Sequence, residues 1–87
     1  MYFASQSCHL PNQVPIEYEM KYSHIRDEER RKYLGQLSIL DESIGNITKK
    51  LNKLNILNNT IIVFTSDNGG GVYTSGRNFP LRGFINL

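Results

Sequence analysis

The sequence has little cysteine: its 87 residues include one, Cys8. A single cysteine excludes an internal disulfide and a cysteine-rich metal cluster. A concentration of positive charge is missing too, because lysines and arginines are interspersed with acidic residues and the net charge is only +2. Nucleic-acid-binding surfaces usually carry a basic stripe with interleaved aromatic residues, so nucleic acid is not expected as a partner.

Long apolar runs are also missing. No stretch approaches the roughly 18 apolar residues of a membrane-spanning helix, so no membrane span is predicted. Residues 1–5 lack the basic and apolar regions of a signal peptide, and none is predicted. The glycines match neither G-x-x-x-x-G-K-[ST] nor G-x-G-x-x-G, so nucleotide binding is not predicted either. A chain of this size buries only about 60% of its unfolded surface, and we therefore expect it to be part of something larger.

The most informative stretch spans residues 60–71. Residues 60–65 form an unbroken run of β-branched and aromatic side chains, typical of a strand buried on both faces. Ser66, Asp67 and Asn68 follow, and three glycines then form a turn where backbone can approach a ligand closely. Open α/β sheets bind ligands beyond the carboxyl ends of their strands, so we expect a site here.

The preceding residues predict a short strand, a rigid loop and a long helix. Residues 2–4 are aromatic and short, which would place His9 at the end of a first strand. Pro11 and Pro15 indicate an extended connection, and residues 17–25 are irregular with at most a short helical turn.

From Asp27 onward, apolar residues recur at alternating steps of four and three, which is typical of one face of an amphipathic helix. They are Tyr33, Leu37, Leu40, Ile44, Ile47, Leu51 and Leu54. Acidic residues at its start and lysines near its end match the helix dipole. A coiled coil is the alternative, but the spacing lasts about three heptads and Gly35 and Gly45 interrupt it.

Together these elements predict an α/β fold with one βαβ-like crossover, right-handed and with parallel strands. Two strands do not hold a sheet by themselves, because independent stability needs three or more. Residues 72–74 are too short to be a confident third strand.

Asp67 and Asn68 offer a carboxylate and an amide oxygen, hard donors suited to Ca²⁺ or Mg²⁺. The alternative is a hairpin turn, since Asn-Gly is a strong hairpin signal. His9 could donate to an anion or act as a general acid, or it could be an ordinary loop residue. Arg82 could clamp an oxyanion or pair structurally, and the sequence leaves both open.

Two further patterns carry less weight. Cys8 beside His9 is not expected to be a nucleophile–base pair, because neighbours in an extended segment point to opposite faces. N-x-[ST] sequons begin at Asn46 and Asn58, and they are glycosylation sites only if the chain enters the secretory pathway.

Several motifs resemble one family in order and spacing across nearly the whole chain. They are Gln6-Ser7-Cys8-His9-Leu10-Pro11 with Gln13-Val14-Pro15, then residues 33–48, then Asn58 through Gly70 with its Ser66-Asp67-Asn68-Gly69-Gly70 ending, and Asn78-Phe79-Pro80-Leu81-Arg82-Gly83. The chain resembles an internal segment of a sulfatase, of the arylsulfatase B type of animals.

This resemblance implies an alkaline-phosphatase-like α/β fold, with residues 1–87 as part of the catalytic domain. It implies hydrolysis of sulfate esters, as on sulfated glycans, by a formylglycine made from cysteine. Asp67 and Asn68 would be two ligands of one active-site Ca²⁺, and His9 would contact the sulfate or the leaving oxygen. A lysosomal or secreted location is implied as well, where the sequons would be glycosylated.

The chain also departs from the family pattern. The motif Cys-x-Pro/Ala-x-Arg is missing, since Cys8 is followed by His-Leu-Pro, and so are the paired aspartates that complete the metal shell. Ile85 stands where the family places a sulfate-binding lysine. Two oxygen donors leave most of a Ca²⁺ shell to water, so we expect poor metal affinity and no activity of the chain alone.

Two alternatives remain open. One is a truncated, non-catalytic paralogue that acts as a secreted glycoprotein or interaction module. The other is a Mg²⁺ phosphohydrolase using Asp67, which needs a nucleophile that the sequence does not show.

Overall fold

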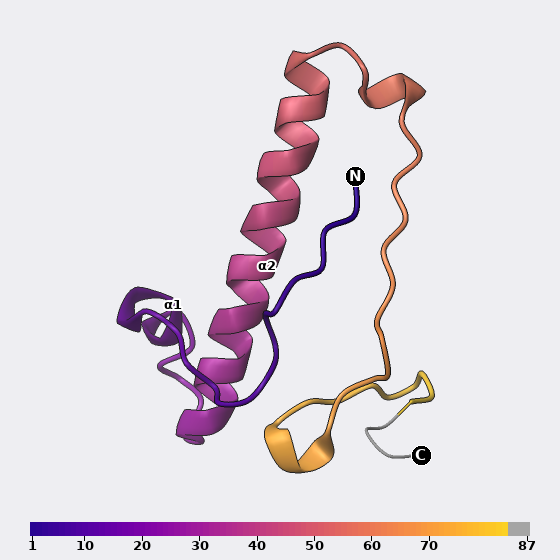
Figure 1. Cartoon of the computed structure of the whole chain (residues 1–87). Coiled ribbons are helices and arrows are strands. Elements are labelled where there is room, and N and C mark those ends of the chain that lie inside the picture. Colours follow the sequence, from indigo (N-terminus) through magenta and orange to yellow (C-terminus); the bar gives the residue numbers. More distant parts are fainter. Residues whose placement is uncertain (84–87) are drawn as a thin grey trace.

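The computed structural model describes residues 1–83. Its helical segments are α1 (Ile16–Met20), α2 (Glu28–Lys53) and two 3₁₀ turns, η1 (Leu57–Asn59) and η2 (Val72–Thr74). Figure 1 shows the chain descending from the N-terminus, ascending along α2 and returning along an extended segment. The other segments therefore lie beside the long helix α2.

Helix α2 confirms the predicted long amphipathic helix. Asp27 is its N-cap, and the Asp27 Oδ1 atom accepts a hydrogen bond from the backbone N–H of Arg30 at 3.0 Å. This bond satisfies one of the amide groups that a helix start leaves unpaired. Acidic residues in the first turn and lysines in the last turn stabilise the ends through the helix dipole.

Helix α1 and the loop before it pack on the first half of α2. The helical turn expected within residues 17–25 is present, although it begins one residue earlier, at Ile16. Close approach depends on Gly35 of α2, where an added Cβ would lie 3.0 Å from Cγ2 of Val14. Asn12 is buried and donates from Nδ2 to Glu29 Oε2 at 3.1 Å, which fixes the loop on the helix.

The predicted strands are not formed within residues 1–83. The segment expected to be buried on both faces is extended but open to solvent, with Ile61 92%, Val63 81% and Phe64 74% exposed. Residues 2–4 are likewise exposed. The prediction of burial is therefore wrong for this chain by itself, because a strand needs neighbours on both sides and these residues have none.

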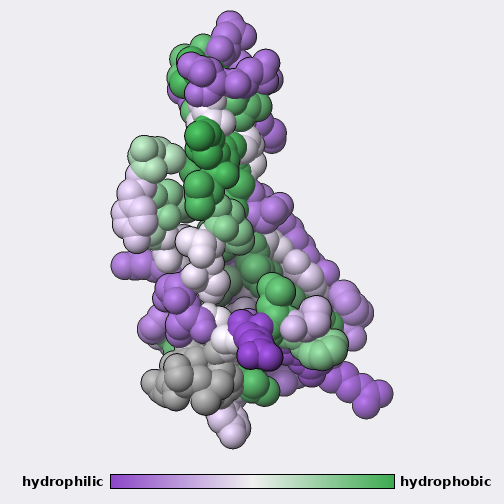
Figure 2. Space-filling model, turned by 90° about the vertical axis from the view of Figure 1, so that its right-hand side faces the viewer, coloured by the Kyte–Doolittle hydropathy of each residue, from purple (hydrophilic) through white to green (hydrophobic). Residues whose placement is uncertain are grey.

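Apolar surface remains uncovered across the described residues. None of their hydrophobic side chains is fully buried, and the apolar stripe of α2 is only partly covered. Figure 2 shows apolar side chains gathered on the face that carries the extended segment. The hydrophobic effect disfavours such a surface in water, so further protein surface is needed to cover it.

None of the helices in residues 1–83 combines the length and apolar character needed to cross a bilayer.

Candidate functional site

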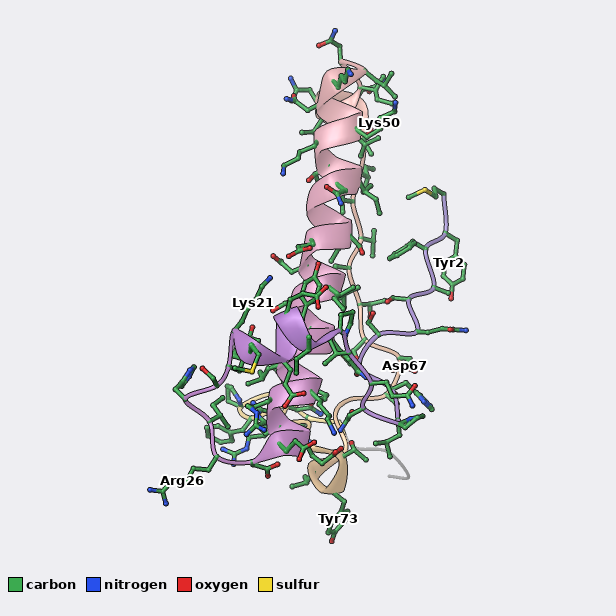
Figure 3. All side chains as sticks on the ribbon, turned by 90° about the vertical axis from the view of Figure 1, so that its left-hand side faces the viewer. Tyr2, Lys21, Arg26, Lys50, Asp67 and Tyr73 are labelled. Atoms are coloured by element: carbon green, nitrogen blue, oxygen red, sulfur yellow. The ribbon has the colours of Figure 1, made fainter. Side chains whose placement is uncertain are left out.

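The candidate cation ligands lie where the extended segment ends. Asp67 and Asn68 are both exposed, and Figure 3 shows Asp67 on the side of the molecule away from Lys21 and Arg26. Asp67 Oδ1 accepts the backbone N–H of Asn68 at 2.8 Å. Ser66 Oγ accepts the N–H of Gly69 at 3.2 Å, so side chains of the turn hold its own backbone.

The side chains of Asp67 and Asn68 face each other. The side-chain nitrogen of Asn68 donates to Oδ2 of Asp67 at 3.1 Å and also contacts Oδ1. A carboxylate only accepts hydrogen bonds, so the donor in this contact is the amide nitrogen.

This donor set fits a hard cation in part. A carboxylate oxygen and an amide oxygen are the ligand types that Ca²⁺ prefers, and adjacent Asp67 and Asn68 carry them, with the amide nitrogen on the carboxylate. Within the described part of the chain, however, no group of three or more His, Cys, Asp or Glu residues could hold a metal ion. These two residues therefore supply only a fraction of a cation shell.

The hairpin alternative is wrong. The residues after the glycines form the turn η2 and not a return strand, and no strand pairing occurs within residues 1–83. The loop is held instead by Asn78, whose Oδ1 accepts the N–H of Gly70 at 2.8 Å. Sequence reasoning assigned no role to Asn78, since nothing in its local pattern reveals a partner eight residues earlier.

The His9 side chain is exposed, and its orientation is determined locally. Nδ1 lies 2.7 Å from the carbonyl oxygen of Leu10, which only accepts, so Nδ1 carries the proton and donates. Nε2 is consequently the ring nitrogen that can meet an anion or a leaving oxygen. The contact of His9 with a sulfate group stays a prediction.

The backbone around His9 is held by Gln36, which sequence reasoning missed. The buried Gln36 side chain donates from Nε2 toward the carbonyl oxygens of His9 (3.4 Å), Pro11 (3.5 Å) and Gln13 (3.3 Å). Its Oε1 is buried without a hydrogen-bond partner. The sequence shows only that Gln36 is an amide next to Leu37 of the apolar stripe. Its hydrogen-bond partners lie 23 to 27 residues earlier, so the sequence does not reveal them.

His9 and the cation ligands are not brought into one cavity. A shallow depression of about 340 Å³ lies beside His9 and is lined on the helix side by Gln36 and Ile39. Neither Asp67 nor Asn68 lines it. Within residues 1–83, Asp67 and Asn68 contact each other, and His9 lies apart from both.

Cys8 and His9 do not form a nucleophile–base pair. Burial raises the pKa of the Cys8 thiol, which disfavours the reactive thiolate. The Nδ1 atom of His9 is engaged with Leu10. Cys8 has a φ of +69° and lies in a turn, so the extended segment assumed for it is wrong.

The remaining candidates are exposed. Asn46 lies on α2 and Asn58 lies in η1, both with accessible side chains, and their glycosylation stays a prediction. Arg82 is exposed as well, and its two interpretations stay predictions. His24 is exposed, and its ring centroid lies 6.5 Å from that of Tyr22.

Comparison with known proteins places the chain in a family. The family model described as Sulfatase matches residues 1–86. The chain is 45% identical over 83 residues to Arylsulfatase J of Mus musculus, covering 95% of this chain and 14% of that protein. It is 34% identical over 56 residues to Iduronate 2-sulfatase of Homo sapiens, covering 64% of this chain and 9% of that protein.

A bacterial relative also carries the name of a sulfatase. The chain is 32% identical over 71 residues to Uncharacterized sulfatase YdeN of Escherichia coli, covering 79% of this chain and 12% of that protein. The chain thus spans about one-seventh or less of the length of these curated relatives. The match over residues 1–86 nevertheless shows the family: the chain belongs to the sulfatase family.

Proposed function

We propose that this chain is part of a sulfatase catalytic domain that hydrolyses sulfate esters, with sulfated glycans as the substrate class. Asp67 and Asn68 supply two oxygen ligands to one active-site Ca²⁺. The observation that carries the proposal is the match of the Sulfatase family model over residues 1–86, with Asp67 and Asn68 adjacent at the end of an apolar extended segment.

Each residue has a defined part in the proposed mechanism. A bound Ca²⁺ would supply positive charge that stabilises the sulfuryl group during transfer. Asp67 and Asn68 hold that charge at the end of the segment. His9, oriented by its bond to the Leu10 carbonyl, presents Nε2 to the sulfate or the leaving oxygen.

These residues do not catalyse by themselves. The chain has no Cys-x-Pro/Ala-x-Arg sequence from which the formylglycine nucleophile could be made. Most of the Ca²⁺ shell is likewise missing, since six to eight oxygens are usual. Catalysis therefore requires residues other than these 87.

The proposed architecture is an α/β, alkaline-phosphatase-like fold in which these residues form one βαβ-like crossover. In Figure 1 residues 1–7 and the extended segment both descend while α2 ascends, and this common direction supports a parallel crossover. The exposed apolar side chains of residues 61–64 support burial between neighbouring strands.

The finer assignments belong to the same proposal. They are the arylsulfatase B type, Ca²⁺ as the metal, and a lysosomal or secreted location. The exposure of Asn46 and Asn58 supports glycosylation in such a compartment, because an acceptor asparagine has to be accessible.

A graft tests the function. The matched 83-residue segment of this chain replaces its counterpart in mouse Arylsulfatase J, and hydrolysis of an aryl sulfate is measured with and without Ca²⁺. We expect Ca²⁺-dependent turnover, and a loss of about 100-fold in kcat/KM on Asp67→Ala, because a metal ligand is removed. Glu17→Ala, which removes an exposed carboxylate from α1, is the matched control and should leave kcat/KM unchanged.

The competing non-catalytic interpretation is favoured by the missing nucleophile motif together with the two exposed sequon asparagines. It predicts a cooperative thermal melt and secretion of the 87-residue chain with both sequons occupied. The catalytic proposal predicts neither a cooperative melt nor turnover by the chain alone. Full turnover by the Asp67→Ala graft would contradict the cation assignment.

A further inference from the structure

The turn after the extended segment contains the one Asn–Gly bond of the chain, between Asn68 and Gly69. The Asn68 side chain is exposed and lies outside the helices. An asparagine side chain is short enough for its amide carbon to close a small ring with the backbone nitrogen of the next residue. The amide carbon of Asn68 is therefore open to attack by the Gly69 nitrogen.

Gly69 leaves that nitrogen accessible, because it has no Cβ to shield it and rotates more freely than other residues. Its φ of +98° lies in a region that other residues rarely adopt. A Cβ at this position would lie 2.7 Å from the carbonyl carbon of Gly83. The packing of the loop thus requires glycine directly after Asn68.

The other exposed asparagines within residues 1–83 are less reactive by position. Each is followed by a residue with a side chain, and Asn46 and Asn52 lie within α2, whose backbone is held by helical hydrogen bonds. Asn55 is the best internal comparison, since it is exposed, lies outside the helix and has a φ of +57°. The β-branched Ile56 follows it, and the Ile56 nitrogen donates to the carbonyl oxygen of Leu51 at 3.1 Å.

Two hydrogen bonds hold the reacting groups of the turn. The N–H of Gly69 donates to Oγ of Ser66 at 3.2 Å, and this bond has to break before the nitrogen can turn toward the Asn68 side chain. The side-chain nitrogen of Asn68 donates to Oδ2 of Asp67 at 3.1 Å. A carboxylate in this place stabilises positive charge on the nitrogen as it departs.

We propose that Asn68 is a site of spontaneous deamidation, and that the Ser66 hydroxyl slows the reaction by holding the N–H of Gly69. The proposal goes beyond the proposed function and does not depend on Ca²⁺ binding. Its product is an aspartate or isoaspartate at position 68, which carries a negative charge that the amide lacks.

The reaction needs only water and hydroxide. Hydroxide removes the proton from the Gly69 nitrogen, which then forms a bond to the side-chain carbonyl carbon of Asn68. The bond from this carbon to the side-chain nitrogen breaks, and that nitrogen takes a proton from water and leaves as ammonia. Water then opens the cyclic imide, giving aspartate when the side-chain carbonyl is attacked and isoaspartate when the backbone carbonyl is attacked.

The test is incubation of the 87-residue chain at mildly alkaline pH, followed by mass spectrometry of its proteolytic peptides. We expect the side-chain NH₂ to be replaced by OH about tenfold faster at Asn68 than at Asn55, a difference of about 1.4 kcal/mol in activation free energy. The rate should rise with pH, because attack requires loss of the Gly69 N–H proton. Backbone fragmentation should identify isoaspartate together with aspartate. Equal rates at Asn68 and Asn55 would overturn the modification site.

A variant of Ser66 tests the restraint. Ser66→Ala should raise the rate at Asn68 about threefold, as expected for the loss of one hydrogen bond of modest net strength. In urea, where the turn is unfolded, the original chain and Ser66→Ala should react equally fast.

Thr74→Val is the matched control for general loosening of the loop. It removes the 2.9 Å bond from Oγ1 of Thr74 to the carbonyl oxygen of Gly71 and leaves the Ser66 bond in place, so the rate should not change. An unchanged rate in Ser66→Ala in buffer, or an equal rise in Thr74→Val, would overturn the role of Ser66.

Discussion

Glu19 of α1 and Arg31 of α2 form an ion pair in which Nε of Arg31 lies 3.1 Å from Oε1 of Glu19. The two side chains are only 11% and 21% exposed, respectively. Nη1 of the same arginine donates to the carbonyl oxygens of Ile25 at 3.0 Å and Arg26 at 3.2 Å. One guanidinium thereby joins α1, the connecting turn and α2.

Arg31→Ala should loosen the docking of α1 by about 3 kcal/mol, because it leaves the Glu19 carboxylate in a poorly solvated place without a partner. Hydrogen exchange of the α1 amides measures the effect. Lys21→Ala is the control: its pair with Glu42 has side chains 49% and 51% exposed and should contribute under about 1 kcal/mol. Equal exchange rates in the Arg31→Ala and Lys21→Ala variants would show that the more buried ion pair does not contribute more to the docking of α1.

The contact between Tyr18 of α1 and Glu42 of α2 should depend on pH. Hydrogen bonds from Tyr18 (2.6 Å) and Lys21 (3.1 Å) hold the pKa of Glu42 below its usual range. A carboxyl with a lowered folded-state pKa stabilises the fold above its unfolded pKa and loses that contribution as pH falls through the folded value. We expect the Tyr18 ring signals in NMR to report loss of the Tyr18–Glu42 hydrogen bond as pH falls below about 4, and Glu42→Gln to remove this dependence.

Gln36→Leu should loosen the loop that carries His9. The substitution keeps the volume and removes the donor directed at the carbonyl oxygens of His9, Pro11 and Gln13. We expect faster hydrogen exchange in the loop and a broader distribution of His9 ring signals, with α2 unchanged by circular dichroism. Gln6→Leu, at an exposed position in the N-terminal segment, is the control. Unchanged His9 signals would show that Gln36 does not hold the loop.

Local features were predictable from the sequence, and long-range pairings were not. Helix α2 is specified by its apolar period, its Asp27 N-cap and its charged ends, all of which lie within one stretch. The extended segment was expected to be a strand from its composition, but a strand needs partners that residues 1–83 do not provide.

In the candidate site, too, the local features were predictable and the long-range contacts were not. The sequence places a carboxylate and an amide at the end of an apolar segment, and in the structure the Asn68 amide nitrogen donates to the Asp67 carboxylate. The supporting contacts of Gln36 and Asn78 were missed, because each joins positions that are separate in sequence and no local pattern encodes such a pairing.

Cys8 should react slowly with alkylating reagents near neutral pH. Burial raises the pKa of its thiol, so the thiolate fraction is smaller than in a free cysteine. The rate with iodoacetamide, compared with glutathione and with the urea-unfolded chain, checks this. Faster reaction in the folded chain than in urea would contradict the assignment of Cys8 as an unreactive residue and reopen the pairing with His9.

Val63→Lys should have opposite effects in two settings. In the 87-residue chain Val63 is 81% exposed within an apolar segment, so a charge there should reduce aggregation, measured by light scattering. In the Arylsulfatase J graft the proposed strand is buried, and an unpaired lysine should prevent folding at a cost of several kcal/mol. Val72→Lys, on η2 and 64% exposed, is the matched control and should be tolerated in the graft. A folded, active Val63→Lys graft would show that this segment is not a buried strand, and the parallel crossover would then be wrong.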